Sequence, residues 1–542
     1  MTEKQPVYVM PENVQRTIGQ DAQRNNILAA RIVADTVKTT LGPKGMDKML
    51  VDGAGNIIVT NDGVTILEEI EIEHPAAKMM VEIARTQENE VGDGTTTAVM
   101  LAGKLLENAE KLLDSKIHPT VIAKGYNIAA EKAQDILKTL SSRITTDDEE
   151  SLKQIAATSM TGKGIEGQKE KFSEIIVESV KQIENYGDID LDNIKIEKIK
   201  GDSIKDTGLI SGIVIDNEKS NIDMPKKVDN AKIALLDIPL EIKNPEIETK
   251  INISSPEQLQ GFIDSEERAL KEMISKIKNS GANVVFCQKG IDDIAQYYLT
   301  KEGIYACRRV AKSDMEKLAR ATGGKIISNL SDLDMENLGS SKSVEEIKMS
   351  DNSMTYVNGC INPKAITIII RGGSEHIIDE TERAIKDGMG DVAAVLKDGN
   401  VVAGGGAIEI ELSKKLREFS QTLSGREQLA VEQFASALEC IPISLSENAG
   451  LDPIDILTEL KSAHEGENKN MGLNLFNNKI EDTFKAGIIE PLKVKTQAIS
   501  SASEVANMIL RIDDVIASKG NSEKGRGMQG MPGMGFGWEI FK

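Results

Sequence analysis

The amino-acid sequence predicts a multidomain α+β protein in which both ends of the chain build one mostly helical domain. A chain of 542 residues is too long for a single hydrophobic core, so two to four domains are expected. Helical periodicity dominates residues 21–140 and returns after residue 406, whereas apolar runs typical of strands lie between residues 209 and 370. We therefore expect the chain to leave a helical domain, to build an α/β domain and to return.

The N-terminal segment begins with a helix and a hairpin. Residues 21–41 repeat apolar side chains on one helical face, and Gly42 followed by Pro43 is expected to end that helix. Two apolar runs, residues 49–51 and 57–60, flank a glycine-rich turn and predict a β-hairpin.

Further helices are expected from Val64 and from Pro75, because a proline ring fits the first position of a helix. Helices continue to Leu140, and a polar, acidic break follows at residues 145–150. The helix that begins at Pro75 leads directly into the most informative stretch of the sequence.

Residues 92–97 have the sequence Gly-Asp-Gly-Thr-Thr-Thr and precede a strongly periodic helix. The free backbone N–H groups and the positive dipole end of that helix would face phosphate oxygens, and the glycines allow a close approach. Asp93 is a hard oxygen ligand that suits a magnesium ion carried in with phosphates. An ordinary helix cap is the alternative, but one cap needs only one such residue. The stretch therefore predicts a phosphate-binding loop.

The central part of the chain alternates strands with helices, which is the pattern of an α/β domain. Residues 242–255 are polar and contain proline, and a long charged helix with a thin apolar stripe follows at residues 256–278. Such a stripe suits a protrusion or a contact between subunits, and equally a surface helix on its own domain. The expected strands are residues 209–215, 233–238, 284–287, 304–307, 325–328 and 366–370.

Helical texture returns after the triple glycine at residues 404–406. Helices are expected at residues 409–417, 428–438 and 453–460, where apolar residues recur at helical spacing. The segment 520–537 repeats Gly and Met without periodicity, so we expect it to be disordered.

The composition argues against several classes of function. Lys and Arg number 65 against 86 Asp and Glu, and this net charge of -21 disfavours a nucleic-acid-binding surface. No apolar run can span a bilayer, and residues 1–16 lack the apolar core of a signal peptide. The four cysteines have no metal-ligand spacing and predict free buried thiols in a reducing compartment. We therefore expect a cytoplasmic protein that binds neither nucleic acid nor membranes.

Other loops could also contact a nucleotide. They lie at residues 41–45, at 61–63 with Asp62, at 161–164 with Lys163, and at 404–406. Each is a weak signal alone, because glycine turns are common between secondary-structure elements. The Gly-x4-Gly-Lys-Ser/Thr phosphate loop is absent from the sequence, which removes the commonest nucleotide-hydrolase fold from consideration.

ATP hydrolysis needs a group that orients the attacking water. Asp387 is a candidate, since it lies on the polar side of a predicted helix marked by Ile378, Ile385 and Val392. By composition alone, Asp387 would be an ordinary solvated surface acid.

Together and in this order, these motifs closely resemble a chaperonin. The resemblance is carried by residues 41–50 (LGPKGMDKML), 61–67 (NDGVTIL), 92–97 (GDGTTT) and 404–406 (GGG). The first of these, with Gly125-Tyr126 and the VKTQA stretch at 494–498, is similar to the group II branch, the archaeal thermosome subunits. The similarity covers about residues 10–520.

The resemblance implies an ATPase that uses ATP and Mg²⁺. Asp93 matches the magnesium-binding position, and Asp387 matches the aspartate that positions the hydrolytic water, with Asp62 as a nearby polar helper. Lys163 matches the lysine that senses the γ-phosphate. The positions that match the family's phosphate contacts are Gly42, Pro43, Gly94, Thr95, Thr96 and Thr97, and those that match its nucleoside contacts are Gly405, Gly472 and Glu490.

The resemblance also implies three domains and a disordered tail. The equatorial ATPase domain would comprise residues 1–145 and 405–520, and the intermediate hinge domain residues 146–215 and 368–404. The apical substrate-binding domain would comprise residues 216–367, with a lid protrusion at about residues 242–278, and a Gly/Met tail would follow at residues 521–542.

For function, the resemblance implies an ATP-dependent chaperone that encloses non-native polypeptides. The subunits would form a double ring with eight or nine copies per ring, closed by a built-in lid without a separate co-chaperonin. Two features depart from the family. Gly388 and Gly390 replace larger helix formers beside Asp387, and each lowers helix stability by up to about 1 kcal/mol, which implies a softer hinge. The sequence offers no explanation for the ending at residues 538–542 (WEIFK).

Two alternatives belong to other classes of protein. A small-molecule kinase or other ATP-dependent transferase would share the phosphate-binding loop and be a monomer or a small oligomer, but the sequence shows no small-substrate signature. A structural ring protein with vestigial nucleotide sites would tolerate loss of the carboxylates, whereas Asp62, Asp93 and Asp387 are all present.

Overall fold

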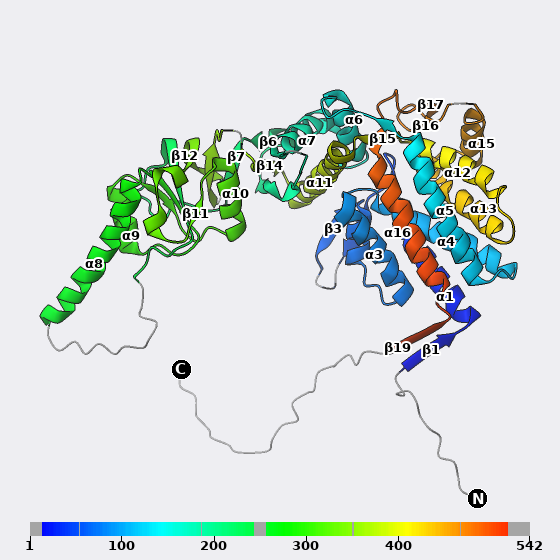
Figure 1. Ribbon diagram of the computed structural model, residues 1–542, viewed down its shortest axis with the longest axis horizontal. Helices are drawn as coiled ribbons and strands as arrows, with labels where there is room; N and C mark the ends of the chain where they lie inside the picture. The colour runs from blue at the N-terminus through cyan, green and yellow to red at the C-terminus, as the bar shows by residue number, and fades with distance from the viewer. Residues whose placement is uncertain are drawn as a thin grey trace, which may run out of the picture.

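A computed structural model describes residues 14–518, apart from residues 52, 54, 186, 243–255, 350–351, 362 and 467. The molecule is elongated (Figure 1): a helical part holds the first and last described elements, an α/β part lies at the opposite end, and a smaller middle part joins them. The predictions for residues 1–13, for nearly all of residues 242–255 and for the Gly/Met tail lie outside the described residues.

The helical part is built from both ends of the chain, as predicted. Buried residues such as Ile27, Leu105 and Ala502 belong to one continuous core, although they are far apart in sequence. Its helices are α1 (Gln20–Lys38), α2 (Gly63–Glu69), α3 (Pro75–Val91), α4 (Thr95–Asp114), α5 (Pro119–Leu140), α12 (Ala407–Ser420), α13 (Glu427–Leu438), α14 (Cys440–Asn448), α15 (Pro453–Ala463) and α16 (Leu492–Leu510).

The predicted helix starts hold to within two residues, but the predicted ends of α1, α12 and α15 are each wrong by three residues. Helix α3 begins at Pro75, and α2 begins one residue before Val64 because the Asp62 side chain caps it. Helix α1 ends at Lys38 rather than at residue 41. The hydroxyl of Thr40 donates to the carbonyl of Val37 at 2.9 Å, which closes the last turn before the Gly-Pro stop.

Small antiparallel sheets edge the helical part. The predicted hairpin is confirmed, with pairing that runs from Lys48 opposite Thr60 to Val51 opposite Ile57. The sequence did not predict that the two chain ends pair with each other through the first and last strands. The strands are β1 (Val14–Ile18) with β19 (Asp514–Ser518), β2 (Lys48–Val51) with β3 (Ile57–Thr60), β4 (Ser142–Arg143) and β18 (Ile489–Pro491) with β15 (Asn400–Ala403), and β16 (Met471–Asn474) with β17 (Lys479–Asp482).

The middle part has its own core of buried aliphatic side chains, to which Ile155, Ile176 and Ile385 belong. The acidic break predicted at residues 145–150 is shorter than expected, because Asp148 caps a helix that starts at Glu149. The elements are α6 (Glu149–Ser159), α7 (Lys169–Ile183), α11 (Glu375–Asp398), and a sheet of β5 (Ile194–Lys200), β14 (Ile366–Gly372) and β6 (Gly208–Ile210).

The single strand predicted at residues 209–215 is wrong. The chain forms two strands there, β6 in the middle part and β7 (Gly212–Ile215) in the α/β part. Gly212 lies so close to the next strand that an added Cβ would be 1.9 Å from the carbonyl oxygen of Val357. The chain therefore passes from one sheet to the other at a position where only glycine fits.

The α/β part alternates strands and helices, as predicted. Its central strands β8, β9 and β10 are parallel, whereas the long hairpin of β12 and β13, which the sequence did not predict, pairs antiparallel with β8 and β7. The sheet order is β10-β9-β8-β12-β13-β7, with β11 on β8, and the elements are β8 (Lys227–Leu236), α8 (Pro256–Asn279), β9 (Val284–Cys287), α9 (Asp293–Lys301), β10 (Tyr305–Cys307), α10 (Lys312–Thr322), β11 (Ile326–Ile327), β12 (Gly339–Met349) and β13 (Asn352–Asn358).

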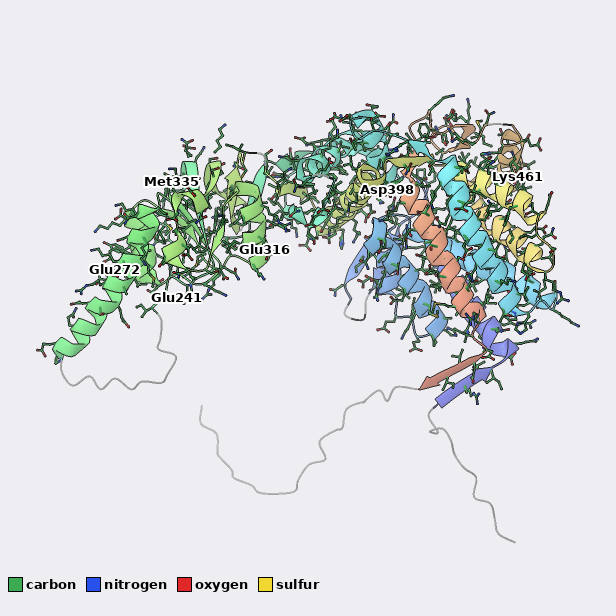
Figure 2. All side chains as sticks on the ribbon, viewed as in Figure 1. Glu241, Glu272, Glu316, Met335, Asp398 and Lys461 are labelled. Atoms are coloured by element: carbon green, nitrogen blue, oxygen red, sulfur yellow. The ribbon has the colours of Figure 1, made fainter. Side chains whose placement is uncertain are left out.

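Helix α8 combines the two alternatives that its sequence left open. Its C-terminal half packs on its own domain through Leu270, Ile274 and Ile277, which are buried. Its N-terminal half extends away from the sheet at one end of the molecule (Figure 1). Figure 2 labels Glu272 in the C-terminal half of α8, and Asp398, the last residue of α11, at the junction with the helical part.

Two smaller expectations can be compared with the structure. All four cysteines are free and buried, as predicted. Among the described residues, no helix has both the length and the apolar character needed to cross a membrane. The chain is thus a multidomain α+β protein, and the exact domain boundaries stay a prediction.

Candidate functional site

A cavity of about 350 Å³ lies between the helical part and the middle part. This volume is within the range of small-molecule sites in proteins. The predicted residues that line it are Gly42, Pro43, Asp62, Asp93, Gly94, Thr95, Thr96, Thr97, Lys163, Asp387, Gly405 and Glu490. Gly472 does not line the cavity and lies behind it, where an added Cβ would be 2.7 Å from the carbonyl oxygen of Gly404.

One end of the cavity is built for anions. The N-termini of helices α2 and α4 reach it together, since an added Cβ on Gly63 would be 2.7 Å from Oγ1 of Thr96. Gly94 has a φ of 79°, and an added Cβ there would be 2.6 Å from Val494. Two adjacent helix N-termini provide free N–H groups and positive dipole ends, which stabilise phosphate oxygens.

Two predicted carboxylates are held by local backbone contacts in this end of the cavity. The Asp62 side chain accepts hydrogen bonds from the backbone N–H groups of Val64 and Thr65 as the cap of α2. Asp93 Oδ1 accepts a hydrogen bond of 2.7 Å from the backbone N–H of Gly94. The second carboxylate oxygen of Asp93 can therefore serve another partner.

Asp387 and Lys163 come from different elements, and their side chains contact each other in the cavity wall. Asp387 lies on α11, Lys163 lies in the loop after α6, and the two form a buried ion pair. Burial raises the pKa of Asp387 to about 7, although Lys163 opposes the shift. Burial also opposes the charge of Lys163, but the carboxylates of Asp387 and Asp93 outweigh it and raise the pKa of the lysine.

The two unusual glycines beside Asp387 have a packing role. An added Cβ on Gly390 would be 2.4 Å from the carbonyl oxygen of Val91, at the end of α3. An added Cβ on Gly388 would be 2.8 Å from the terminal carbon of Ile176. Helix α11 therefore approaches the phosphate-binding loop more closely than a side chain at position 390 would permit.

The other end of the cavity is apolar and suits a nucleoside. Leu41, Ile441, Leu445 and Leu473 line it. Gly405 has a φ of 66°, and an added Cβ would be 2.7 Å from the carbonyl oxygen of Leu473, so the triple glycine keeps this end open.

Sequence reasoning missed two carboxyl groups near Asp387. Asp391 lines the cavity one helical turn further on, is buried, and has an Oδ1 atom without a hydrogen-bond partner in the described part of the chain. Burial, with Asp93 nearby, raises its pKa well above the ordinary value. Spacing of four residues on a helix places Asp387 and Asp391 on one face, which is the signal that could have found Asp391.

Glu88 on α3 is the other missed group. Burial first, and then the charges of Asp387, Asp62 and Asp93, raise the pKa of Glu88 to about 8. The folded protein therefore holds a proton on this carboxyl through a pH range in which the unfolded chain has lost it.

This raised pKa predicts a pH-dependent stability. Between about pH 4.5 and pH 8 the native state binds the extra proton, so the free energy of unfolding falls as pH rises, by up to about 1.4 kcal/mol per pH unit. Glu88→Gln removes this titration. Without nucleotide, the variant should gain stability over the wild type as pH rises towards 8, and the gain should level off above that pH.

Denaturant midpoints from pH 5 to pH 9 measure the effect. Glu82→Gln is the matched control, because Glu82 lies on the same helix with an exposed side chain. Parallel pH profiles for wild type and Glu88→Gln would contradict the assignment.

Comparisons with known proteins agree with the motifs and the fold. The model of the TCP-1/cpn60 chaperonin family matches residues 33–520. The thermosome subunit beta of Archaeoglobus fulgidus is 59% identical over 98% of both chains, and the thermosome subunit of Methanopyrus kandleri is 58% identical over 95% of both chains. The thermosome subunit alpha of Archaeoglobus fulgidus is 57% identical over 97% of both chains.

Proposed function

Because the chain belongs to the TCP-1/cpn60 chaperonin family, we propose that it is an ATP-driven chaperone subunit that encloses non-native polypeptides and promotes their folding. The observation that carries the ATPase part is the Lys163–Asp387 pair, which lines one cavity together with the N-termini of α2 and α4. No observation favours the small-molecule kinase.

The residues of the cavity fit ATP with Mg²⁺. The N-termini of α2 and α4 with Gly94 would receive phosphate oxygens, and the apolar end with Gly405 would receive the nucleoside. Asp93 would hold Mg²⁺ through its second oxygen, since the first accepts the N–H of Gly94. When bound, Mg²⁺ neutralises phosphate charge.

The protein side chains would then act on a water molecule. Asp387 would accept a hydrogen bond from the attacking water and orient it in line with the γ-phosphate, with Asp62 as a nearby polar helper. Lys163 would turn from Asp387 to a γ-phosphate oxygen. Asp387 and Lys163 come from different elements of the middle part. Breaking their ion pair would therefore allow these elements to move relative to each other.

This arrangement supports a separate role for each of the three proposed domains. Residues 1–145 and 405–520 would bind the nucleotide, residues 146–215 and 368–404 would act as the hinge, and residues 216–367 would hold the client. The projecting half of α8, within the proposed lid at residues 242–278, lies at the end of the molecule away from the helical part (Figure 1). ATP turnover would thus move a distant lid through the middle part.

Open strand edges support self-association. The β1–β19 ribbon and the β2–β3 hairpin each have only two strands, and they lie apart on the helical part (Figure 1). Both expose apolar side chains, including Ile18 and Ile516 on the ribbon and Met49 and Val51 on the hairpin. Two-stranded sheets are marginally stable alone, and exposed edges pair with other chains. We infer that the hairpin of one subunit adds to the ribbon of the next.

If each subunit pairs its β2–β3 hairpin with the β1–β19 ribbon of the next subunit, the subunits can close into a ring. We propose a double ring with eight or nine subunits per ring, non-native polypeptides as clients, and no separate lid co-chaperonin. Neither nucleic acid nor membranes are proposed as partners. A cytoplasmic location agrees with the four free buried thiols.

Val51→Lys should break the ring. The lysine would place a charge on the apolar face that the neighbouring subunit covers, so the protein should elute as single subunits or small oligomers. Light scattering after size-exclusion chromatography measures the mass. Ile222→Lys is the matched control, because Ile222 is also an exposed aliphatic residue but lies in the α/β part. An intact ring in Val51→Lys would contradict the proposed pairing.

The proposed function as a whole is tested by native mass and phosphate release, each with and without Mg-ATP. A large ring that hydrolyses ATP and suppresses aggregation of a denatured test enzyme is the expected result. A monomer or dimer that hydrolyses ATP without affecting aggregation would overturn it.

A further inference from the structure

A buried ion-pair cluster forms part of the cavity wall beside the triple glycine. Lys495, on the first turn of α16, places Nζ 2.9 Å from Glu409 Oε1 and 2.5 Å from Glu490 Oε2. Glu490 and Lys495 both line the cavity, but the side chain of Glu490 is 23% exposed and that of Lys495 only 8%, while that of Glu409 is 5% exposed. Glu490 is therefore the member of the cluster that is most accessible from the cavity.

The backbone fixes where Glu490 can be. Glu490 lies on β18, opposite Val402 on β15, and β15 leads directly into the triple glycine. An added Cβ on Gly404 would be 2.6 Å from Glu490 Oε1, so the missing side chain leaves room for that oxygen. One oxygen of Glu490 is thus held by Lys495, while the other lies beside the glycine turn of the cavity.

The positive charge of Lys495 compensates the negative charges of Glu409 and Glu490. Burial opposes its charge, but Glu409 and Glu490 outweigh this effect and raise the pKa of Lys495, so the lysine stays charged. Burial raises the pKa of Glu490 even though Lys495 opposes the shift. Among the ion pairs of the described residues, Lys495 is the one cationic partner of Glu490.

A buried ion pair adds little net stability compared with an apolar replacement of similar size, so its presence calls for another reason. Here the reason is on the open side, since Glu490 presents a carboxylate to the cavity beside the glycine turn against which Leu473 packs. Carboxylates accept hydrogen bonds from hydroxyl groups, and the hydroxyl groups of a nucleoside are those of its ribose.

We propose that Lys495, held in place by Glu409, is a positioning residue that aims Glu490 at the ribose hydroxyls and so makes the site prefer ribonucleotides to deoxyribonucleotides. The inference rests on the proposed ATP site. Lys495 would not touch the nucleotide phosphates, and its effect would pass through Glu490 alone.

The test compares KM values for ATP, 2′-deoxy-ATP and 3′-deoxy-ATP in the full-length assembly, with ADP affinity by calorimetry. Wild type should have a KM for ATP lower than that for at least one analogue by on the order of tenfold, because a site built to bind a hydroxyl rejects the analogue without it. Lys495→Met should raise the KM for ATP by about that factor and leave kcat and the analogue KM nearly unchanged. In this variant the ratio of the analogue KM to the KM for ATP would then approach one.

Three further variants separate positioning from a general loss of structure. Lys495→Arg should retain most of the preference. Lys493→Met is the matched control, since Lys493 is more exposed on the same turn and pairs with Glu90 at 4.0 Å instead. The double variant Glu409→Gln with Lys495→Met removes one acid together with the lysine, so it should fold even if the single variant does not, and it should still lack the preference.

The outcomes separate this inference from the proposed function. A wild-type protein that binds and hydrolyses ATP, with the same ribose preference in Lys495→Met, overturns the positioning role alone. A wild-type protein without any preference overturns the ribose contact of Glu490. A wild-type protein that binds no ATP overturns the proposed function and this inference with it.

Discussion

Asp387→Ala is expected to lower steady-state ATP turnover by about 10²- to 10⁴-fold, the usual contribution of a positioned acid–base group. The variant should still bind ATP, because the helix N-termini and the apolar end of the cavity are untouched. Lys163 would lose its partner and remain free to meet a phosphate. Phosphate release under saturating Mg-ATP, with calorimetric titration of ADP, measures both quantities.

The control for this variant lies on the same helix. Asp379 is also on α11, but its exposed side chain pairs with Lys198 far from the cavity, so Asp379→Ala should keep wild-type turnover. Light scattering establishes that both variants assemble. If Asp387→Ala turned over ATP at the wild-type rate, another group would have to orient the water.

Gly390→Ala is expected to reduce turnover on the order of 100-fold, without touching any group that carries the chemistry. The added methyl carbon would be 2.4 Å from a backbone carbonyl oxygen of α3, which cannot move aside cheaply, so α11 must shift away from the phosphate-binding loop. A displacement of about 1 Å of a catalytic group can cost this much. Single-turnover phosphate release separates the loss in chemistry from a loss in binding.

Gly388→Ala is the matched comparison. Its added carbon would be too close to the terminal carbon of Ile176 alone, which is the flexible end of a side chain, and would be at ordinary contact distance from Ala156 and Met160. Both substitutions favour the helix equally, by up to about 1 kcal/mol. If softness of the hinge were the reason for both glycines, the two variants should behave alike, whereas close packing predicts that only Gly390→Ala is impaired.

The sequence predicted best what depends on local rules. The hairpin at residues 48–60, the start of α3 at Pro75 and the start of α4 after Gly94 all follow from turn, cap and dipole preferences within a few residues. The phosphate end of the cavity could be predicted for the same reason, because its donors sit at helix starts.

Long-range features were out of reach. Nothing near residue 14 shows that it pairs with residue 518, and nothing in residues 209–215 shows that the chain changes sheets at Gly212. The β12–β13 hairpin was missed because its strands are polar and charged at many positions, which hides their period. Lys495 and Glu409 gave no sign of a cluster, since 86 residues separate them.

The pairing of the two chain ends has a consequence for biosynthesis. The strands of the α/β part all lie between residues 212 and 358, so this part can close as soon as it leaves the ribosome. Helices α1, α3, α4 and α5 must wait for α16, which emerges about 370 residues after α5 and completes their core. At usual translation speeds this delay is on the order of half a minute. The inserted part therefore folds before the part that precedes it, and the newly made subunit exposes its own apolar helix faces for much of its synthesis.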